Sequence, residues 1–265
     1  MITGKIKFLE EDFATIANSA TAVTDDGTNA ELLLSENVET QWVSLIDSDD
    51  VAVTITINFP ATRIDRILLV NHNIREMDII GSIANVKDGD NRDISTTGII
   101  NSRTTSYFSF SEVLLTSLTF VLRGTITPNQ LKRIGRIILT KEIGTLEGYP
   151  IMSGFLFSDN AASYKAKAGR ELISKQLRTL SRFRLSFKNY TKINDIALMH
   201  RIHRRQTPLL IWPCGGKEDN FRFLQEGIRL QDIYRMQSKG NMRSKLKAGN
   251  YTGLLDVQIT FVEAV

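Results

Sequence analysis

Apolar and polar residues alternate in short runs along the first half of the chain. Residues 51–60 read VAVTITINFP, in which β-branched residues recur at every second position until a proline. This period of two predicts a strand that ends at Pro60, followed after a two-residue link by a second strand at 63–70. Further strands are predicted at 106–113, 117–124 and 133–142, although the last pattern also fits a short helix. Turns rich in Asp and Gly separate these runs, and residues 29–42 are expected to hold a short helix or turn.

The second half has a different pattern. Residues 193–206 place apolar side chains at helical spacing, with Asp195 in the first turn and Thr207–Pro208 after the end, so a helix is predicted there. Thr191 or Asn194 is the expected cap. Before this helix, residues 164–181 form a basic, linker-like segment. The remaining runs predict strands at 181–187, 209–213, 221–230 and 251–264.

These elements predict the fold class. Many short strands separated by turns are typical of a β-sandwich or jelly roll. We therefore expect a mainly β protein, with an N-terminal β-sandwich jelly roll at residues 1–147 and a C-terminal β-rich domain, residues 148–265, that carries one main helix. The turn at Gly148–Tyr149–Pro150 marks the expected boundary.

The net charge of +4 over 265 residues hides a division between the two halves. Residues 1–150 contain 13 lysine and arginine residues against 20 aspartate and glutamate residues, a net −7, whereas residues 151–265 contain 20 against 9, a net +11. A change of sign this large predicts two units with different partners, or units that pack head to tail in an assembly.

Composition excludes several classes of protein. Cys214 is the only cysteine, so an internal disulfide and a thiolate metal cage are excluded. No run approaches the roughly 20 apolar residues of a membrane helix, and we expect no membrane association. No apolar run follows Lys5 and Lys7 as it would in a secretory signal, so synthesis in the cytoplasm is expected.

Asn71, His72 and Asn73 directly follow the apolar run 67–70 and are the first candidate ligand site. A catalytic histidine needs an orienting carboxylate and a nucleophile, and a metal-binding histidine usually needs further ligands. Glu76 and Asp78 are close in sequence, but no nucleophile or second imidazole is. Since asparagine accepts turn conformations and bonds to nearby backbone, the pattern favours the end of a strand.

Three other patterns fit a structural explanation better than a ligand-binding site. Asp88 and Asp90 lie in KDGDNRD (87–93), where alternating oxygen ligands suit calcium, but the EF-hand glycine and glutamate are missing and an Asp-Gly hairpin turn explains the same residues. His200 and His203 share one helix face as half of a metal site, yet three arginines crowd the same turn. The stretch CGGKED (214–219) lacks the phosphate-loop frame. No cofactor or metal is predicted, and no enzyme.

A basic face is expected in the second half. Its residues are Arg182, Arg184, Arg201, Arg204 and Arg205. Binding of nucleic-acid phosphates by these arginines would be expected together with aromatic residues that stack on bases, or with a base-reading helix motif. The sequence has neither beside these arginines. An acidic protein neighbour is favoured over nucleic acid.

The first half resembles discoidin-like (galactose-binding-like) domains. The resemblance rests on ETQWVSL (39–45), VTITINFP (53–60) and IDRILLVNHNI (64–74), and it covers roughly residues 1–147. It implies an eight-stranded jelly roll whose end loops bind sugars, which makes a carbohydrate-binding module the alternative function and a host-surface glycan the alternative partner.

The second half resembles tail-tip and minor tail proteins of long-tailed phages. The resemblance rests on RFRLSF (182–187), INDIALMHRIHRR (193–205), TPLLIWP (207–213) and DVQITFVEA (256–264). It implies a non-enzymatic structural component of a phage tail tip or baseplate, located in the virion tail. The implied partners are other tail subunits and further copies of the chain, with a connection to fibres or the host surface.

Overall fold

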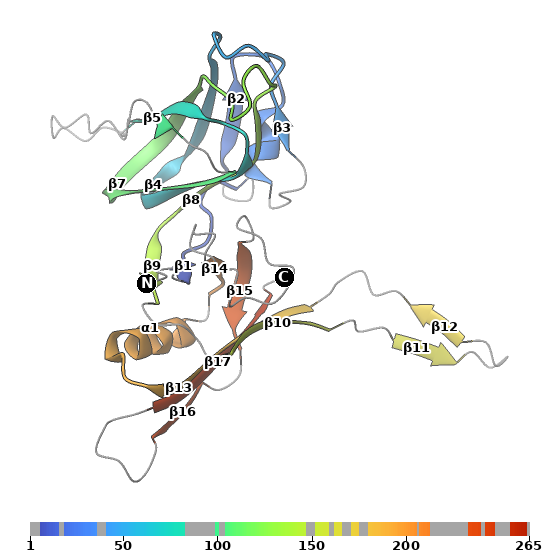
Figure 1. Ribbon diagram of the computed structural model, residues 1–265, viewed down its shortest axis with the longest axis vertical. Coiled ribbons are helices and arrows are strands. Elements are labelled where there is room, and N and C mark those ends of the chain that lie inside the picture. The colour runs from blue at the N-terminus through green and yellow to red at the C-terminus, as the bar shows by residue number, and fades with distance from the viewer. Residues whose placement is uncertain are drawn as a thin grey trace. The chain divides into compact units, whose positions relative to one another are not determined.

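The computed structural model describes residues 6–15, 19–35, 41–82, 99–100, 104–146, 152–158, 162–165, 171–174, 180–205, 207–212, 233–239, 242–246 and 255–263. The protein is mainly β, as the sequence predicts, and its described part contains one α-helix (Figure 1). The chain divides into two compact units. The N-terminal unit is Leu9–Ile143, and the C-terminal unit combines the segment up to Phe8 with Gly144–Val265. The sequence places the boundary at 147/148, whereas the chain passes between the units after Phe8 and again after Ile143.

The N-terminal unit is an antiparallel sheet that bends around one core. Its strand order is β3-β8-β4-β7-β5-β6, with β2 added beside β4. A 3-10 helix, η2 (Ala30–Leu34), is capped at its N-terminus by Asn29, whose side chain accepts the Glu31 N–H. The strands are β2 (Thr21–Thr24), β3 (Trp42–Val43), β4 (Val53–His72), β5 (Glu76–Ser82), β6 (Ile99–Ile100), β7 (Thr105–Leu122) and β8 (Arg133–Thr140).

Two long strands replace four predicted short ones. The expected strands at 51–60 and 63–70 are one strand, β4, so the prediction that Pro60 ends a strand is wrong. The pairing of β4 with β7 is irregular between Asn58 and Thr62 and again between Ile64 and Arg66. A proline fits at such a bulge because the ladder needs no N–H there. The expected strands at 106–113 and 117–124 likewise form the single strand β7.

The irregular stretch of β4 separates two sets of neighbours. Its first part pairs with β2 and the end of β7, and its second part pairs with β8 and the start of β7. Apolar residues from both parts, such as Ile55 and Ile67, belong to one buried cluster together with Trp42 and Phe120. The bent long strands therefore supply both layers of the sandwich.

The C-terminal unit is built on an eight-stranded sheet of order β10-β13-β17-β15-β14-β1-β9, with β16 beside β17. Its strands are β1 (Lys7–Leu9), β9 (Glu142–Thr145), β10 (Met152–Ser158), β13 (Leu180–Tyr190), β14 (Leu209–Trp212), β15 (Tyr234–Ser238), β16 (Arg243–Leu246) and β17 (Leu255–Glu263). Strands β11 (Ala162–Lys165) and β12 (Glu171–Ser174) form a separate hairpin, which corrects the prediction of a linker. The sequence pattern did not reveal this hairpin, because the hairpin is defined by the pairing of two segments, in which Lys165 lies opposite Glu171.

The helix α1 (Ile193–Arg204) confirms the helix prediction but not its cap. Lys192 occupies the N-cap and makes no side-chain capping hydrogen bond. Met199 and Ile202 are fully buried, and α1 packs against β17. At Gly144 on β9 an added Cβ would lie 2.7 Å from the Leu198 side chain, so the strand approaches the helix closely.

The core of this unit is apolar and aromatic. The ring centroids of Phe8 and Phe261 are 5.8 Å apart, and all four residues of β14 are buried. None of the helices in the described ranges is long and apolar enough to span a membrane. The predicted strand at 221–230, the turn at 148–150 and the CGGKED stretch lie outside the described residues.

Candidate functional site

The Asn71–Asn73 triplet forms the corner where β4 ends, as the sequence favours. Asn71 has a φ of 54°, a left-handed conformation that asparagine tolerates. The Asn73 side chain donates to the Leu131 carbonyl at 2.9 Å and accepts the Arg133 N–H at 2.7 Å. Its amide is therefore occupied by the loop that precedes β8.

His72 is buried within this corner and has two hydrogen-bond partners. Its Nδ1 accepts the Ile74 N–H at 3.1 Å, so in the neutral ring Nε2 carries the proton and donates to the Ser106 hydroxyl 2.8 Å away. Burial lowers the pKa of His72 to about 4. The imidazole is thus a neutral structural link between β4 and β7.

We expect acid to destabilise the N-terminal unit through His72. Between pH 6.5 and about 4 the imidazole is protonated in the unfolded chain but neutral in the folded chain, so the free energy of unfolding decreases as the pH falls through this window. The loss should total about 3 kcal/mol and end below pH 4. Urea unfolding at a series of pH values measures it. His72→Gln is the control because an amide donates and accepts without titrating, and equal pH slopes for the two proteins would contradict the assignment.

Lys132 fastens the loop between β3 and β4. Its side chain is completely buried, and the ammonium donates to the carbonyls of Ser48 at 2.9 Å and Val51 at 3.1 Å. Burial lowers the pKa of Lys132, and the nearby carboxylates of Asp49, Asp47 and Asp26 partly offset this effect. A buried ammonium on two carbonyls holds the 44–51 loop in one conformation.

Two of those aspartates tie the same loop to its neighbours. Asp26 accepts the Leu45 N–H at 2.9 Å, and Asp49 accepts both the N–H and the hydroxyl of Thr125 at 3.0 Å. Partial burial opposes ionisation of both carboxyls, but the hydrogen bonds from Thr28 and Leu45 to Asp26, and from Thr125 to Asp49, hold both pKa values below the usual range. Both groups stay charged at neutral pH.

These contacts gather four loops at one end of the sandwich, which we call the loop end. It consists of residues 25–29, 44–51, 71–75 and 123–133, joined by the hydrogen bonds of Asp26, Lys132, Asp49 and Asn73. The Arg75 N–H also donates to the Gly124 carbonyl at 2.8 Å. Loops that are widely separated in sequence therefore present one fixed surface.

Apolar side chains project from this surface. Along the pair β3–β8, Ser44 and Lys132 point inward, while their neighbours point outward, as alternation along extended chains requires. The exposed apolar residues of the 44–51 loop and of the β3–β8 pair, which we call the apolar patch, are Leu45, Val51, Leu131 and Val43, with exposed fractions of 73%, 47%, 39% and 38%. The patch is the candidate functional site of the N-terminal unit.

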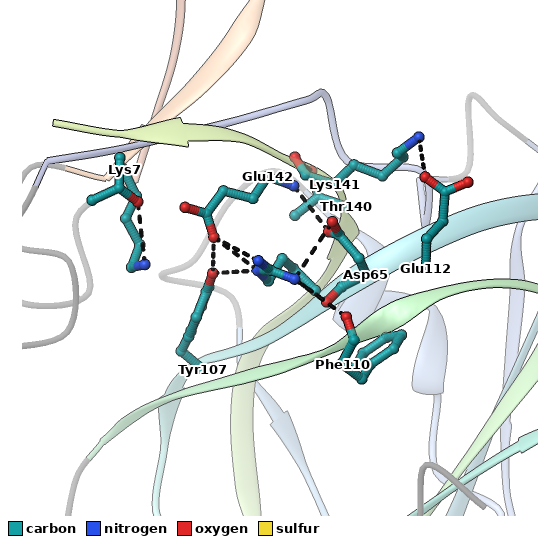
Figure 2. Close-up of polar contacts among 10 residues, drawn as sticks. Lys7, Asp65, Tyr107, Phe110, Glu112, Thr140, Lys141 and Glu142 are labelled. Carbon is teal, nitrogen blue, oxygen red and sulfur yellow. Dashed lines mark hydrogen bonds and ion pairs between the residues drawn. The ribbon is translucent and has the colours of Figure 1, made fainter. Parts of the chain in front are cut away.

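A second polar cluster lies near the end of β8. Arg66 Nη2 lies 2.8 Å from the Glu142 carboxylate, and the Tyr107 hydroxyl donates to the same oxygen at 2.7 Å (Figure 2). Asp65 accepts the Glu142 N–H at 2.9 Å. Burial and the Glu142 carboxylate raise the pKa of Tyr107, so its hydroxyl remains protonated. The cluster ties β4, β7 and β9 together beside the irregular pairing of β4.

The predicted basic face comes from two elements. Arg184 is exposed on β13, and Arg182 lies two residues earlier on the same strand, where its backbone pairs with Val262. Arg201 and Arg204 are exposed on α1, and Arg205 is its C-cap. Leu185 and Phe187, which follow Arg184, are buried, which matches the expected strand with one solvent-facing side.

Both histidines of α1, His200 and His203, are partly exposed. His203 Nδ1 lies 2.9 Å from the Ser238 hydroxyl, and its Nε2 is 3.5 Å from the Met242 N–H. Among the residues that the structure describes, no three His, Cys, Asp or Glu side chains are grouped to hold a metal ion. Asp88, Asp90 and Cys214 lie outside the described residues.

The sequence did not single out the loop end as a surface. Its prediction for 47–50 was a turn, and Lys132 had no distinguishing neighbour in the sequence. Leu131 precedes Lys132 and Arg133 follows it, and lysine is almost never fully buried without partners, so no signal in the sequence indicates that Lys132 is buried. The partners come from the 44–51 loop, about 80 residues away.

Comparison with known proteins gives matches to solved structures only. No family model and no curated protein matches the sequence. A chitosan-binding module from a Paenibacillus chitosanase/glucanase is 13% identical with a TM-score of 0.39, over 49% of this chain and 98% of the module. A family 32 carbohydrate-binding module from Clostridium perfringens, in complex with galactose, has 13% identity and a TM-score of 0.39 over 51% and 98%. A Ruminococcus gnavus fucosidase matches with 13% identity and a TM-score of 0.40 over 49% of this chain and 26% of the enzyme. Carbohydrate-binding modules are thus among the structures to which about half of the chain is similar.

Proposed function

We propose that the protein is a non-enzymatic structural component of a bacteriophage tail tip or baseplate. The observation that carries this proposal is the convergence of the four segments on which the resemblance to tail proteins rests. They supply β13, α1, β14 and β17 of one unit, in which β13 pairs with β17 along most of its length and α1 packs against β17. Segments that assemble into one sheet-and-helix unit are what a shared domain would produce.

The charge of the two units supports a role in assembly. Residues 9–143 contain 11 lysine and arginine residues against 19 aspartate and glutamate residues, a net −8. The rest of the chain contains 22 against 10, a net +12. Opposite charges of this size steer subunits toward one another and select their relative orientation.

The polar groups of the N-terminal unit support a structural role. His72, Asn73 and Lys132 use their hydrogen-bonding atoms on neighbouring loops and strands. Arg66, Tyr107 and Glu142 bond to one another. Such contacts fix geometry, which is what a tail subunit needs when it repeats in several copies through large interfaces.

The test is a phage in which this gene carries an early stop codon. We expect particles without a complete tail tip in electron micrographs, restoration when the protein is supplied in trans, and antibody labelling of the tail in wild-type virions. Complete tails in the absence of the protein, or wild-type tails that the antibody does not label, would contradict the proposal.

A carbohydrate-binding module is the second candidate. The observation in its favour is the loop end, where the exposed carboxylates of Asp47 and Asp50 lie in the same loop as apolar side chains. Sugars offer hydroxyls to such acceptors and C–H faces to apolar surfaces. The test is binding of the full chain to a glycan array. Specific binding that Asp50→Ala abolishes and Ile80→Ser leaves intact would support this candidate, and no binding would remove it.

A further inference from the structure

Exposed apolar residues gather at the loop end. In the described part, seven large apolar side chains are exposed, and four of them form the apolar patch. Single exposed apolar residues are ordinary on protein surfaces, whereas a group rimmed by polar residues marks an interaction site. The rim here is acidic on the side of the 44–51 loop, since Asp47 and Asp50 are exposed, with Arg133 on the opposite border.

The patch is held ready for a partner. Leu45 lies near the start of the 44–51 loop, whose backbone is held by Asp26 at Leu45 and by Lys132 at Ser48 and Val51. Little conformational entropy remains to be lost when such a loop is covered. A fixed apolar surface next to carboxylates fits a partner that offers apolar contact together with cations.

Helix α1 of the C-terminal unit presents that combination. Ile193 is the most exposed large apolar residue of the described chain, at 77%. Ala197, Arg201 and Arg204 follow it at intervals of four, four and three residues and are also exposed, so the four residues lie along one side of the helix. We call these four residues the helix stripe. It belongs to the unit with net charge +12, and the apolar patch belongs to the unit with net charge −8.

We infer that the apolar patch of one copy docks on the helix stripe of a second copy. Leu45 would cover Ile193, and the carboxylates of Asp47 and Asp50 would face the guanidinium group of Arg204. Because the two surfaces differ, the contact is heterologous and extends from copy to copy into a ring or a filament. The inference rests on the proposed assembly function and names the surfaces that it would use.

Sedimentation velocity of the full chain tests the contact over a range of protein and salt concentrations. We expect self-association that weakens as salt screens the charges. The patch variant Leu45→Ser with Asp47→Lys and the helix variant Ile193→Ser with Arg204→Glu should each associate at least about tenfold more weakly. Ile80→Ser on β5 and Arg184→Glu on β13 are matched controls at exposed positions, and they should associate as the wild type does.

Mixing the two variants gives a result that only a head-to-tail contact predicts. Each variant keeps one intact surface, so the mixture should form pairs that do not grow further. The inference is overturned by a wild-type chain that stays monomeric, by variants that associate normally, by controls that lose association equally, or by a mixture that forms no pairs. It is also overturned if Leu45→Ser abolishes binding to phosphatidylcholine vesicles and leaves self-association intact.

The outcomes separate this inference from the proposed function. Virions that carry the protein in their tails, combined with variants that associate normally, would reject only the contact. Self-association through these surfaces by a protein that antibodies do not find in virions would reject only the tail role.

Discussion

Asp12→Ala is expected to lower the free energy of unfolding of the N-terminal unit by about 3–5 kcal/mol. The Asp12 carboxylate lies 2.8 Å from Arg136 Nη2, and both side chains are buried. Its other oxygen accepts the N–H groups of Ala14 at 2.9 Å and Leu139 at 3.0 Å. Removing the carboxylate leaves a buried guanidinium without its anion and takes an acceptor from two backbone groups. Denaturant unfolding measures the loss.

An exposed ion pair of similar length provides the control. Lys141 Nζ and the Glu112 carboxylate are 2.7 Å apart, but solvent screens them, so Glu112→Ala should cost less than about 1 kcal/mol. Replacing both members of the buried pair, with Asp12→Leu and Arg136→Met, should cost less than the two single changes added together. Equal losses for Asp12→Ala and Glu112→Ala would show that burial does not set the strength of this pair.

Lys132→Met is expected to cost about 3 kcal/mol and to release the 44–51 loop. Methionine keeps the length and the apolar part of the lysine side chain but cannot donate, so the carbonyls of Ser48 and Val51 lose their partner. Urea unfolding gives the energy. Hydrogen exchange at the Leu45 amide, which donates to Asp26, reports on the loop, and faster exchange is expected.

The same variant connects stability to the inferred contact between copies. If the apolar patch works because its loop is fixed, Lys132→Met should weaken self-association at least about tenfold even though no patch residue changes. Arg63→Met on β4 is the matched control, since its side chain is exposed outside the apolar patch and its rim, and its loss should change stability by less than about 1 kcal/mol. Unchanged exchange at Leu45 in the lysine variant would contradict the role of Lys132.

Local patterns were sufficient for much of the fold. Alternation located the cores of β4, β7 and β17, and helical spacing located α1 within two residues of its observed end. The Asn71–Asn73 corner was also readable, because asparagine reveals a turn through its own side-chain chemistry. These features depend on residues that are neighbours in the sequence.

Other features needed partners from distant segments. Pro60 looked like a strand end, but bending of β4 against β7 created a bulge that accommodates it. Ile193 and Ala197 belong to the apolar helical pattern that predicts α1, yet both are exposed, since the buried side of the helix is set by the sheet against which it packs.

The loop end shows the limit most clearly. Composition and charge revealed an acidic and a basic part of the chain, and periodicity revealed that both are mainly β. Only the folded chain showed that Lys132 is buried and that Leu45 is exposed. It also showed that four separate loops meet around these two residues. Hydrogen-bond partners 58 and 84 residues apart select one of many inward and outward choices that the local sequence leaves equal in energy.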